Sequence, residues 1–198
     1  TVPGVNEKVY SSIKLSYDRL ESDEARSCLL LCSLFPEDYD IPIEYLVRYG
    51  WGRGYFSNCS TLEDTRNRVH SLVAQLQRRF LLIDSSNRET TKMHDIVRDV
   101  AISIASRDPH QFLVRSHAEN KEWPNLATYD TISLVGDMEI PVGCPKLELL
   151  QMMDGRFSKG SMDIICDAMK ELKVLALVGM EMEDLGSSRS PGVLKNLW

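Results

Sequence analysis

The chain has 198 residues, of which 43% are hydrophobic, so it can bury a core and is not expected to be disordered throughout. Its net charge of −6 excludes a general affinity for nucleic acid or acidic membranes. No apolar run reaches the roughly 18 residues that cross a bilayer, and five scattered cysteines predict reduced thiols rather than a disulfide framework.

Residues 5–35 are predicted to form two helices. The second helix begins after Ser22, a good capping residue, is apolar on nearly all sides and ends before Pro36. Cys28 and Cys32 share one of its faces, but two further metal ligands are missing nearby, so we expect core thiols and no metal site. Apolar residues at helical spacing mark the first helix: Val5, Val9, Ile13, Tyr17 and Leu20.

Two more helices are predicted before residue 80. One begins at Pro42, whose fixed φ suits a first helical position, and ends in "GWGRG". This glycine-rich stretch follows a helix and lacks the Lys-Ser/Thr of a P-loop, so it predicts a turn rather than a phosphate site. The other helix begins after Thr61, with Asp64 completing a capping box.

A hairpin and a fifth helix complete the first part of the chain. The β-prone runs "FLLID" and "TTKMH" flank the turn-prone "SSNRE" and predict an antiparallel hairpin. An amphipathic helix follows, with apolar residues recurring from Ile96 to Ala105. Helices followed by a hairpin predict a mainly α winged-helix domain with a β-hairpin wing over residues 1–110.

The pattern changes from residue 129. The runs "TISLVGD", "LELLQMMDG" and "LKVLALVGM" share paired apolar positions, and "VLKNLW" looks like the start of another unit. This predicts the start of an α/β leucine-rich repeat solenoid over residues 129–198, after a connector at 111–128. Because such units are stable only against neighbours, we expect the natural protein to continue past Trp198. The paired positions are Ile132 with Leu134, Leu150 with Met152, and Leu175 with Leu177.

Several motifs resemble those of plant NLR immune receptors. "CLLLCSLFPEDYDI" resembles the family block that contains Phe-Pro-Glu-Asp, and "IKLSYDRL" resembles the segment before it. "KMHDIVRDVA" resembles the Met-His-Asp motif with its following helix. "LVGDMEIPVGCPKLELLQM" is similar to the first repeats of the coiled-coil subclass. "WGRGYF" departs from the family's Trp-x-Ala-Glu-Gly-Phe at Gly52 and Arg53.

The resemblance implies that residues 1–110 are the winged-helix, or second ARC, domain of a nucleotide-binding switch. It implies a P-loop, its Mg²⁺ partners and a signalling domain upstream of Thr1, so we expect this chain not to be an enzyme and not to hold ADP or ATP alone. The implied partners are the upstream nucleotide-binding domain, the downstream repeats, and a pathogen effector or guarded host protein. The implied location is the cytoplasm, with nuclear or membrane-peripheral pools of the intact protein as alternatives.

His94 is the candidate site residue, supported by Met93 and Asp95. The resemblance implies that His94 contacts the β-phosphate of ADP and holds the receptor off until a pathogen is perceived, while the repeats serve autoinhibition and recognition. The residues agree, since a ring N–H before a helix N-terminus suits an anion. We expect Asp95 to cap this helix and Met93 to pack inward. From the residues alone, a His-Asp pair with only a capping role stays open.

Parts of the sequence also bear on three other functions. A DNA-binding regulator would use Arg66, Arg68, Arg78 and Arg79, but residues 1–110 hold 14 basic and 16 acidic residues, a net charge of −2. A leucine-rich repeat adaptor without a nucleotide role would need neither the Phe-Pro-Glu-Asp block nor Met-His-Asp. A hydrolase using His94 is disfavoured because an adjacent aspartate rarely orients a histidine base, and no nucleophile is evident.

Overall fold

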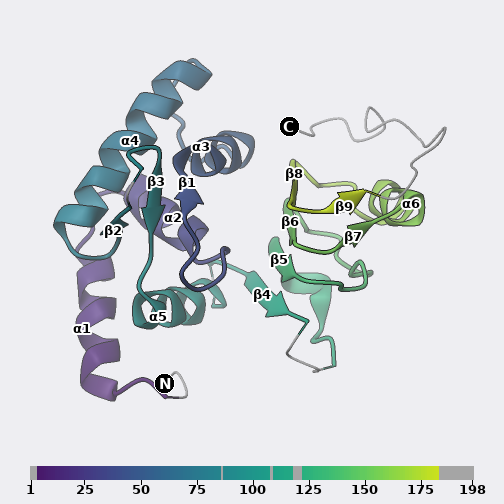
Figure 1. The fold of residues 1–198 in the computed structure, drawn as a ribbon, viewed down its shortest axis with the longest axis horizontal. Coiled ribbons are helices and arrows are strands. Elements are labelled where there is room, and N and C mark those ends of the chain that lie inside the picture. Colours follow the sequence, from purple (N-terminus) through teal and green to yellow (C-terminus); the bar gives the residue numbers. More distant parts are fainter. Residues whose placement is uncertain (1–3, 86, 108, 118–121, 183–198) are drawn as a thin grey trace. The chain divides into compact units, whose positions relative to one another are not determined.

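The computed structural model describes residues 4–85, 87–107, 109–117 and 122–182. It is a mixed α/β structure that divides into two compact units, Thr1–Ala105 and Ser106–Trp198. The first unit (purple to teal in Figure 1) consists of helices and a small antiparallel sheet, and the second (green to yellow) is built on a parallel sheet.

The first unit contains the five predicted helices, α1 (Glu7–Asp18), α2 (Asp23–Cys32), α3 (Ile43–Gly52), α4 (Leu62–Arg78) and α5 (Asp95–Ala105). Helix α2 is the centre of this unit, since it contacts α3, α4 and α5 and its second half is buried. The apolar character that the sequence shows on all sides of α2 therefore matches a helix with neighbours on several faces.

The predicted helix caps are present at α2 and α4. The Ser22 hydroxyl accepts the Ala25 N–H at 3.1 Å, and Thr61 and Asp64 form a reciprocal capping box with bonds of 3.0 and 3.1 Å. The apolar stripe of α1 is buried only towards its end, because Val9 keeps 39% of its surface exposed.

The predicted hairpin is present, and a third strand joins it. Strands β2 (Ile83–Asp84) and β3 (Thr90–Lys92) pair antiparallel, and β1 (Ile41–Pro42) pairs with the other edge of β3. The sequence did not predict β1, because two residues are too few to show the alternation of a strand. Strand β3 ends at Lys92, and the Met-His-Asp motif follows it directly in the sequence.

The second unit is organised around a four-stranded parallel sheet. Its strands are β4 (Phe112–Ser116), β5 (Thr131–Val135), β6 (Leu149–Met153) and β8 (Val174–Val178), in that order. Helix α6 (Lys159–Ala168) lies between β6 and β8 in the sequence and contributes to a buried apolar cluster with one face of the sheet. The remaining elements are η1 (Leu126–Thr128), β7 (Arg156–Phe157) and β9 (Glu181–Met182).

The apolar pairs found in the sequence lie in register across this sheet. Ile132 is opposite Leu150, which is opposite Leu175, and the second member of each pair follows the same alignment. The stretch 111–128 is more than the connector we expected, because β4 within it joins the sheet beside β5. The expected further unit at "VLKNLW" lies outside the described residues.

Among the described residues, no helix is both long enough and apolar enough to cross a bilayer.

Candidate functional site

The Met-His-Asp motif lies at the junction between β3 and α5. Met93 follows the last residue of β3 and is buried, as expected. His94 is exposed, and Asp95 is the first residue of α5. The strand and the helix therefore present the imidazole of His94 at the surface of the first unit.

His94 itself caps α5. Its backbone carbonyl accepts the Arg98 N–H at 2.9 Å, and its ring Nδ1 accepts the Ile96 N–H at 3.3 Å. We expected Asp95 to provide this cap, but no hydrogen bond of the Asp95 carboxylate is found in the part of the chain that the structure describes. The reason is position, because Asp95 already belongs to the helix, where its charge is favoured by the helix dipole.

The capping bond sets the tautomer of the His94 ring. A neutral imidazole has one nitrogen that accepts and one that donates. Because Nδ1 accepts the Ile96 N–H, the ring proton is placed on Nε2, which is available as a donor. This donor, together with the helix N-terminus, fits one oxygen of an anionic group such as a phosphate, but one imidazole is insufficient to hold a nucleotide.

Residues 35–40, called here the 35–40 loop, contact both sides of His94. On the helix side, Arg98 Nε donates to the Phe35 carbonyl at 2.6 Å, and Arg98 Nη1 lies 3.8 Å from Glu37 Oε1. On the strand side, Lys92 Nζ lies 3.4 Å from Asp40 Oδ2. The loop carries the Phe-Pro-Glu-Asp sequence, so two motifs that are far apart in the chain meet here.

The 35–40 loop is anchored by an aromatic cluster. The ring of Phe35 is fully buried and stacks against Tyr39, Tyr45 and Tyr49, with centroid distances of 5.4, 6.1 and 6.0 Å. Burial raises the pKa of the Tyr49 hydroxyl, which keeps this ring neutral. Because two of these tyrosines belong to α3, the loop is tied to that helix.

Asp40 at the end of this loop is kept ionised by its neighbours. The Ser85 hydroxyl donates to Asp40 Oδ1 at 2.5 Å, and this bond, followed by the charge of Lys92, lowers the pKa of Asp40. Thr90 Oγ1 in turn donates to Ser85 Oγ at 2.9 Å. The loop is thus connected to both strands of the hairpin region.

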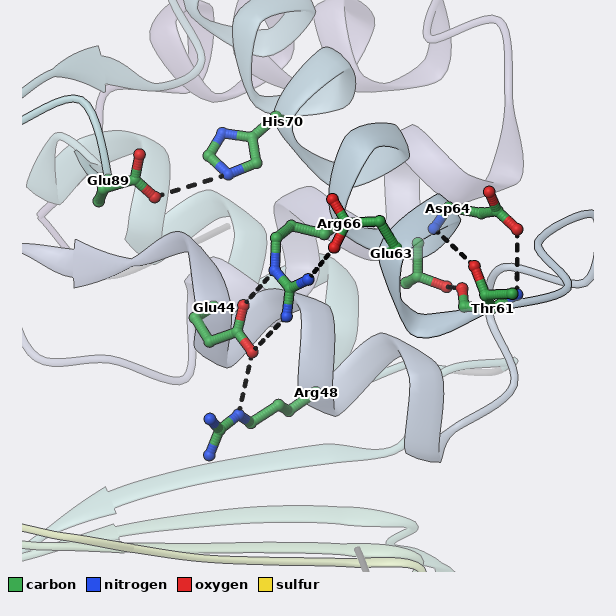
Figure 2. Close-up of polar contacts among 9 residues, drawn as sticks. Glu44, Arg48, Thr61, Glu63, Asp64, Arg66, His70 and Glu89 are labelled. Atoms are coloured by element: carbon green, nitrogen blue, oxygen red, sulfur yellow. Dashed lines mark hydrogen bonds and ion pairs between the residues drawn. The ribbon is translucent and has the colours of Figure 1, made fainter.

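The arginines of α4 are engaged in ion pairs within the first unit. Figure 2 shows Arg66 between the carboxylates of Glu44 and Glu63. Arg66 binds Glu44 through two bonds of 2.9 and 3.1 Å, and Arg48 reaches the same carboxylate at 3.3 Å. The hydrogen bonds from Arg66 are the main cause of the lowered pKa of Glu44.

Two further arginines of this region are paired in the same way. Arg68 Nε donates to Glu24 at 2.6 Å, and Arg79 Nη2 lies 3.2 Å from Glu21. Three of the four arginines named for a DNA-reading helix therefore hold α4 to other elements of the unit. Figure 2 also shows His70 facing Glu89, with Nε2 and Oε2 3.8 Å apart.

The described residues contain no group of three or more His, Cys, Asp or Glu side chains suited to a metal ion. Cys28 and Cys32 are both buried core residues. The contact with Cys28 and burial raise the pKa of the Cys32 thiol, which disfavours the thiolate that a metal would need.

Sequence reasoning missed Arg98 and the 35–40 loop as parts of this site. The signal available was an arginine four residues after His94, in a helix whose mean character is apolar. A charged side chain of this kind predicts a specific buried partner, but the partner comes from a segment 63 residues away and only the fold reveals it.

No family model matches the chain. It is similar to disease resistance protein At4g27190 of Arabidopsis thaliana, with 44% identity over 117 residues, 58% of this chain and 12% of that protein. It is 32% identical to probable disease resistance protein At5g43740 of the same plant over 78% of this chain and 19% of that protein. Disease resistance protein RPS5 is 32% identical over 68% of this chain and 16% of its own length. The chain spans a fifth or less of these relatives.

Proposed function

Because the chain is a homologue of plant disease resistance proteins, we propose that it is part of an intracellular immune receptor of the NLR type. In this proposal the first unit is the winged-helix domain of a nucleotide-dependent switch. The second unit is the beginning of a leucine-rich repeat array. The in-register apolar pairs of β5, β6 and β8 support the repeat assignment, and the hairpin between α4 and α5 supports the winged helix.

The proposed role of His94 is to donate a hydrogen bond from Nε2 to the terminal phosphate of ADP in the closed receptor. The observation that carries this proposal is the capping geometry, in which Nδ1 is used by Ile96 and the exposed ring keeps Nε2–H as its donor. Bound ADP supplies the negative charge, and the upstream nucleotide-binding domain would supply its other contacts. His94 thereby connects the first unit to that domain only while a diphosphate is present.

The size of this contribution suits a switch rather than a permanent bond. A hydrogen bond to a charged group contributes about 1.5–3 kcal/mol, and every 1.4 kcal/mol changes an equilibrium about tenfold. One contact from His94 would then change the ratio of closed to open receptor by roughly ten- to a hundredfold. A signal from the repeats, set off by a pathogen effector or a guarded host protein, could overcome a bias of this size.

The test replaces His94 in the full-length receptor by Asn and by Ala. An asparagine side chain can accept the Ile96 N–H and preserve the cap, but it is shorter than an imidazole. We expect both variants to lose ADP faster than the natural receptor and to signal without a pathogen. Unchanged ADP retention and normal quiescence in both variants would refute the contact. A full-length protein that retains no ADP at all would instead favour a repeat adaptor without a nucleotide role.

A further inference from the structure

We propose that Arg98 is a positioning residue for His94 and that it acts by fixing the start of α5 to the 35–40 loop. This inference rests on the proposed contact between His94 and ADP. In this inference, the Phe-Pro-Glu-Asp segment holds the backbone of His94 in position.

Arg98 joins His94 to the loop through both its backbone and its side chain. Its N–H donates to the His94 carbonyl at 2.9 Å, and its Nε donates to the Phe35 carbonyl at 2.6 Å. The side chain is only 13% exposed, so this charged hydrogen bond is largely removed from water. Charge-assisted bonds of this kind are short and strong, and leaving the carbonyl without its donor is unfavourable.

The strand side of His94 is held by the same loop, but less firmly. Lys92 and Asp40 form an ion pair of 3.4 Å in which both side chains are more than a third exposed. Such pairs contribute little because water and salt screen them. Arg98 is therefore the stronger of the two connections, and Lys92 is the weaker second one.

The far end of the connection explains how it could respond to movement elsewhere. Phe35 is stacked in the aromatic cluster with Tyr45 and Tyr49 of α3, which ties its position to that helix. A displacement of α3 relative to α5 would pull on Arg98 and turn the helix start that carries His94. A hydrogen bond to a phosphate tolerates only a displacement of roughly 0.5 Å, so a small shift is enough to weaken it.

The first experiment measures ADP dissociation from the full-length receptor. Arg98→Met keeps the length of the side chain and removes its donors, and Arg68→Met is the control. Arg68 also makes a 2.6 Å charged bond between elements of the first unit, but its partner Glu24 lies outside the 35–40 loop. We expect Arg98→Met to raise the ADP dissociation rate about tenfold, as loss of an outer partner of a ligand-binding group commonly does, and Arg68→Met to leave it unchanged.

A second measurement needs no nucleotide. In the 198-residue chain, nuclear magnetic resonance reports the Ile96 amide and the tautomer of the His94 ring directly. We expect Arg98→Met to shift the Ile96 amide and to mix the two ring tautomers, while Arg68→Met leaves both signals in place. If Arg98→Met does not fold, Arg98→Lys replaces it, since a lysine keeps the charge but lacks the Nε donor geometry.

The outcomes separate this inference from the proposed function. If His94→Ala has no effect on ADP dissociation, the proposed contact is wrong. If His94→Ala accelerates dissociation and Arg98→Met does not, the contact stands and the positioning role of Arg98 is refuted. Equal effects of Arg98→Met and Arg68→Met would also refute it, because loss of stability alone would then explain both.

Discussion

The replacement of Gly50 by Ala tests the packing of α3, the helix to which the 35–40 loop is tied. In an open helix position this change stabilises by about 1 kcal/mol, because alanine restricts the unfolded chain and favours helix. Gly50 is not open, since a Cβ atom built there would lie 2.0 Å from Cε2 and 2.7 Å from Cζ of Phe56. Phe56 is 4% exposed, so its ring has little room to move away.

The two effects oppose each other, and the steric effect is the larger one. Displacing a buried phenylalanine ring costs about 1.5–3 kcal/mol of burial. After the gain of about 1 kcal/mol is subtracted, we expect Gly50→Ala to destabilise the first unit by about 0.5–2 kcal/mol. Amide hydrogen exchange under mild urea measures this, because it follows the amides of each unit separately.

Gly160 in α6 provides the control, because its added Cβ would meet only Ser158 Oγ at 3.6 Å. We expect Gly160→Ala to leave the exchange of the second unit unchanged or slower. Gly50→Ala should also be less harmful when Phe56 is replaced by Leu, which shortens the ring that causes the conflict. A Gly50→Ala variant as stable as the natural chain would refute the close approach of Phe56.

Three further predictions concern the cap, one ion pair and one turn. His94→Ala should lower the stability of α5 by about 0.5–1 kcal/mol in urea unfolding, whereas His94→Asn should not, because asparagine can still accept the Ile96 N–H; equal losses would contradict the capping role. Arg66 depresses the pKa of Glu44, so the pair stabilises the fold above about pH 4.3, and this contribution is lost as the pH falls through the depressed value. Glu44→Gln should therefore flatten the acid side of a profile of melting temperature against pH. An unchanged slope in this variant would count against a stabilising role of the pair. Gly179 has a φ of +61°, so Gly179→Ala should destabilise the second unit by about 1–2 kcal/mol in urea unfolding, and a neutral result would show that this turn relaxes easily.

Elements with their own local signals were predictable from the sequence. Helix α4 begins where the capping box of Thr61 and Asp64 places its start, because both halves of that signal are local. The parallel strands β5 and β6 are predictable from their paired apolar residues, since the sheet face that packs in the apolar cluster imposes a spacing that the sequence shows directly. The same spacing indicates which side chains of these strands face the core.

Elements that depend on distant partners were missed. Strand β4 contains Arg115, which is buried over the ring of Trp123 at 5.2 Å and donates to the Glu122 carbonyl at 2.9 Å. A charged residue in a short strand looks like part of a connector until the group that covers it is known. The sequence predicts Asp95 instead of His94 as the cap of α5 for a related reason. A shift of one residue decides which side chain faces the helix end, and sequence patterns place helix ends only within a few residues.

The pairing of the arginines on α4, rather than their number, distinguishes a structural role of this helix from DNA binding. Four arginines on one helix are enough to suggest contact with DNA phosphates, but phosphate contacts require cations that are free to exchange their counterions. Arg66 would first have to leave two carboxylates, one of them bound through two parallel bonds. The same chain segment pairs Arg68 and Arg79 with Glu24 and Glu21, so three of the four cations are neutralised by anions of the same unit. A helix whose arginines are used in this way stabilises the domain that carries His94, and a DNA-binding role would have to break that support before it could begin.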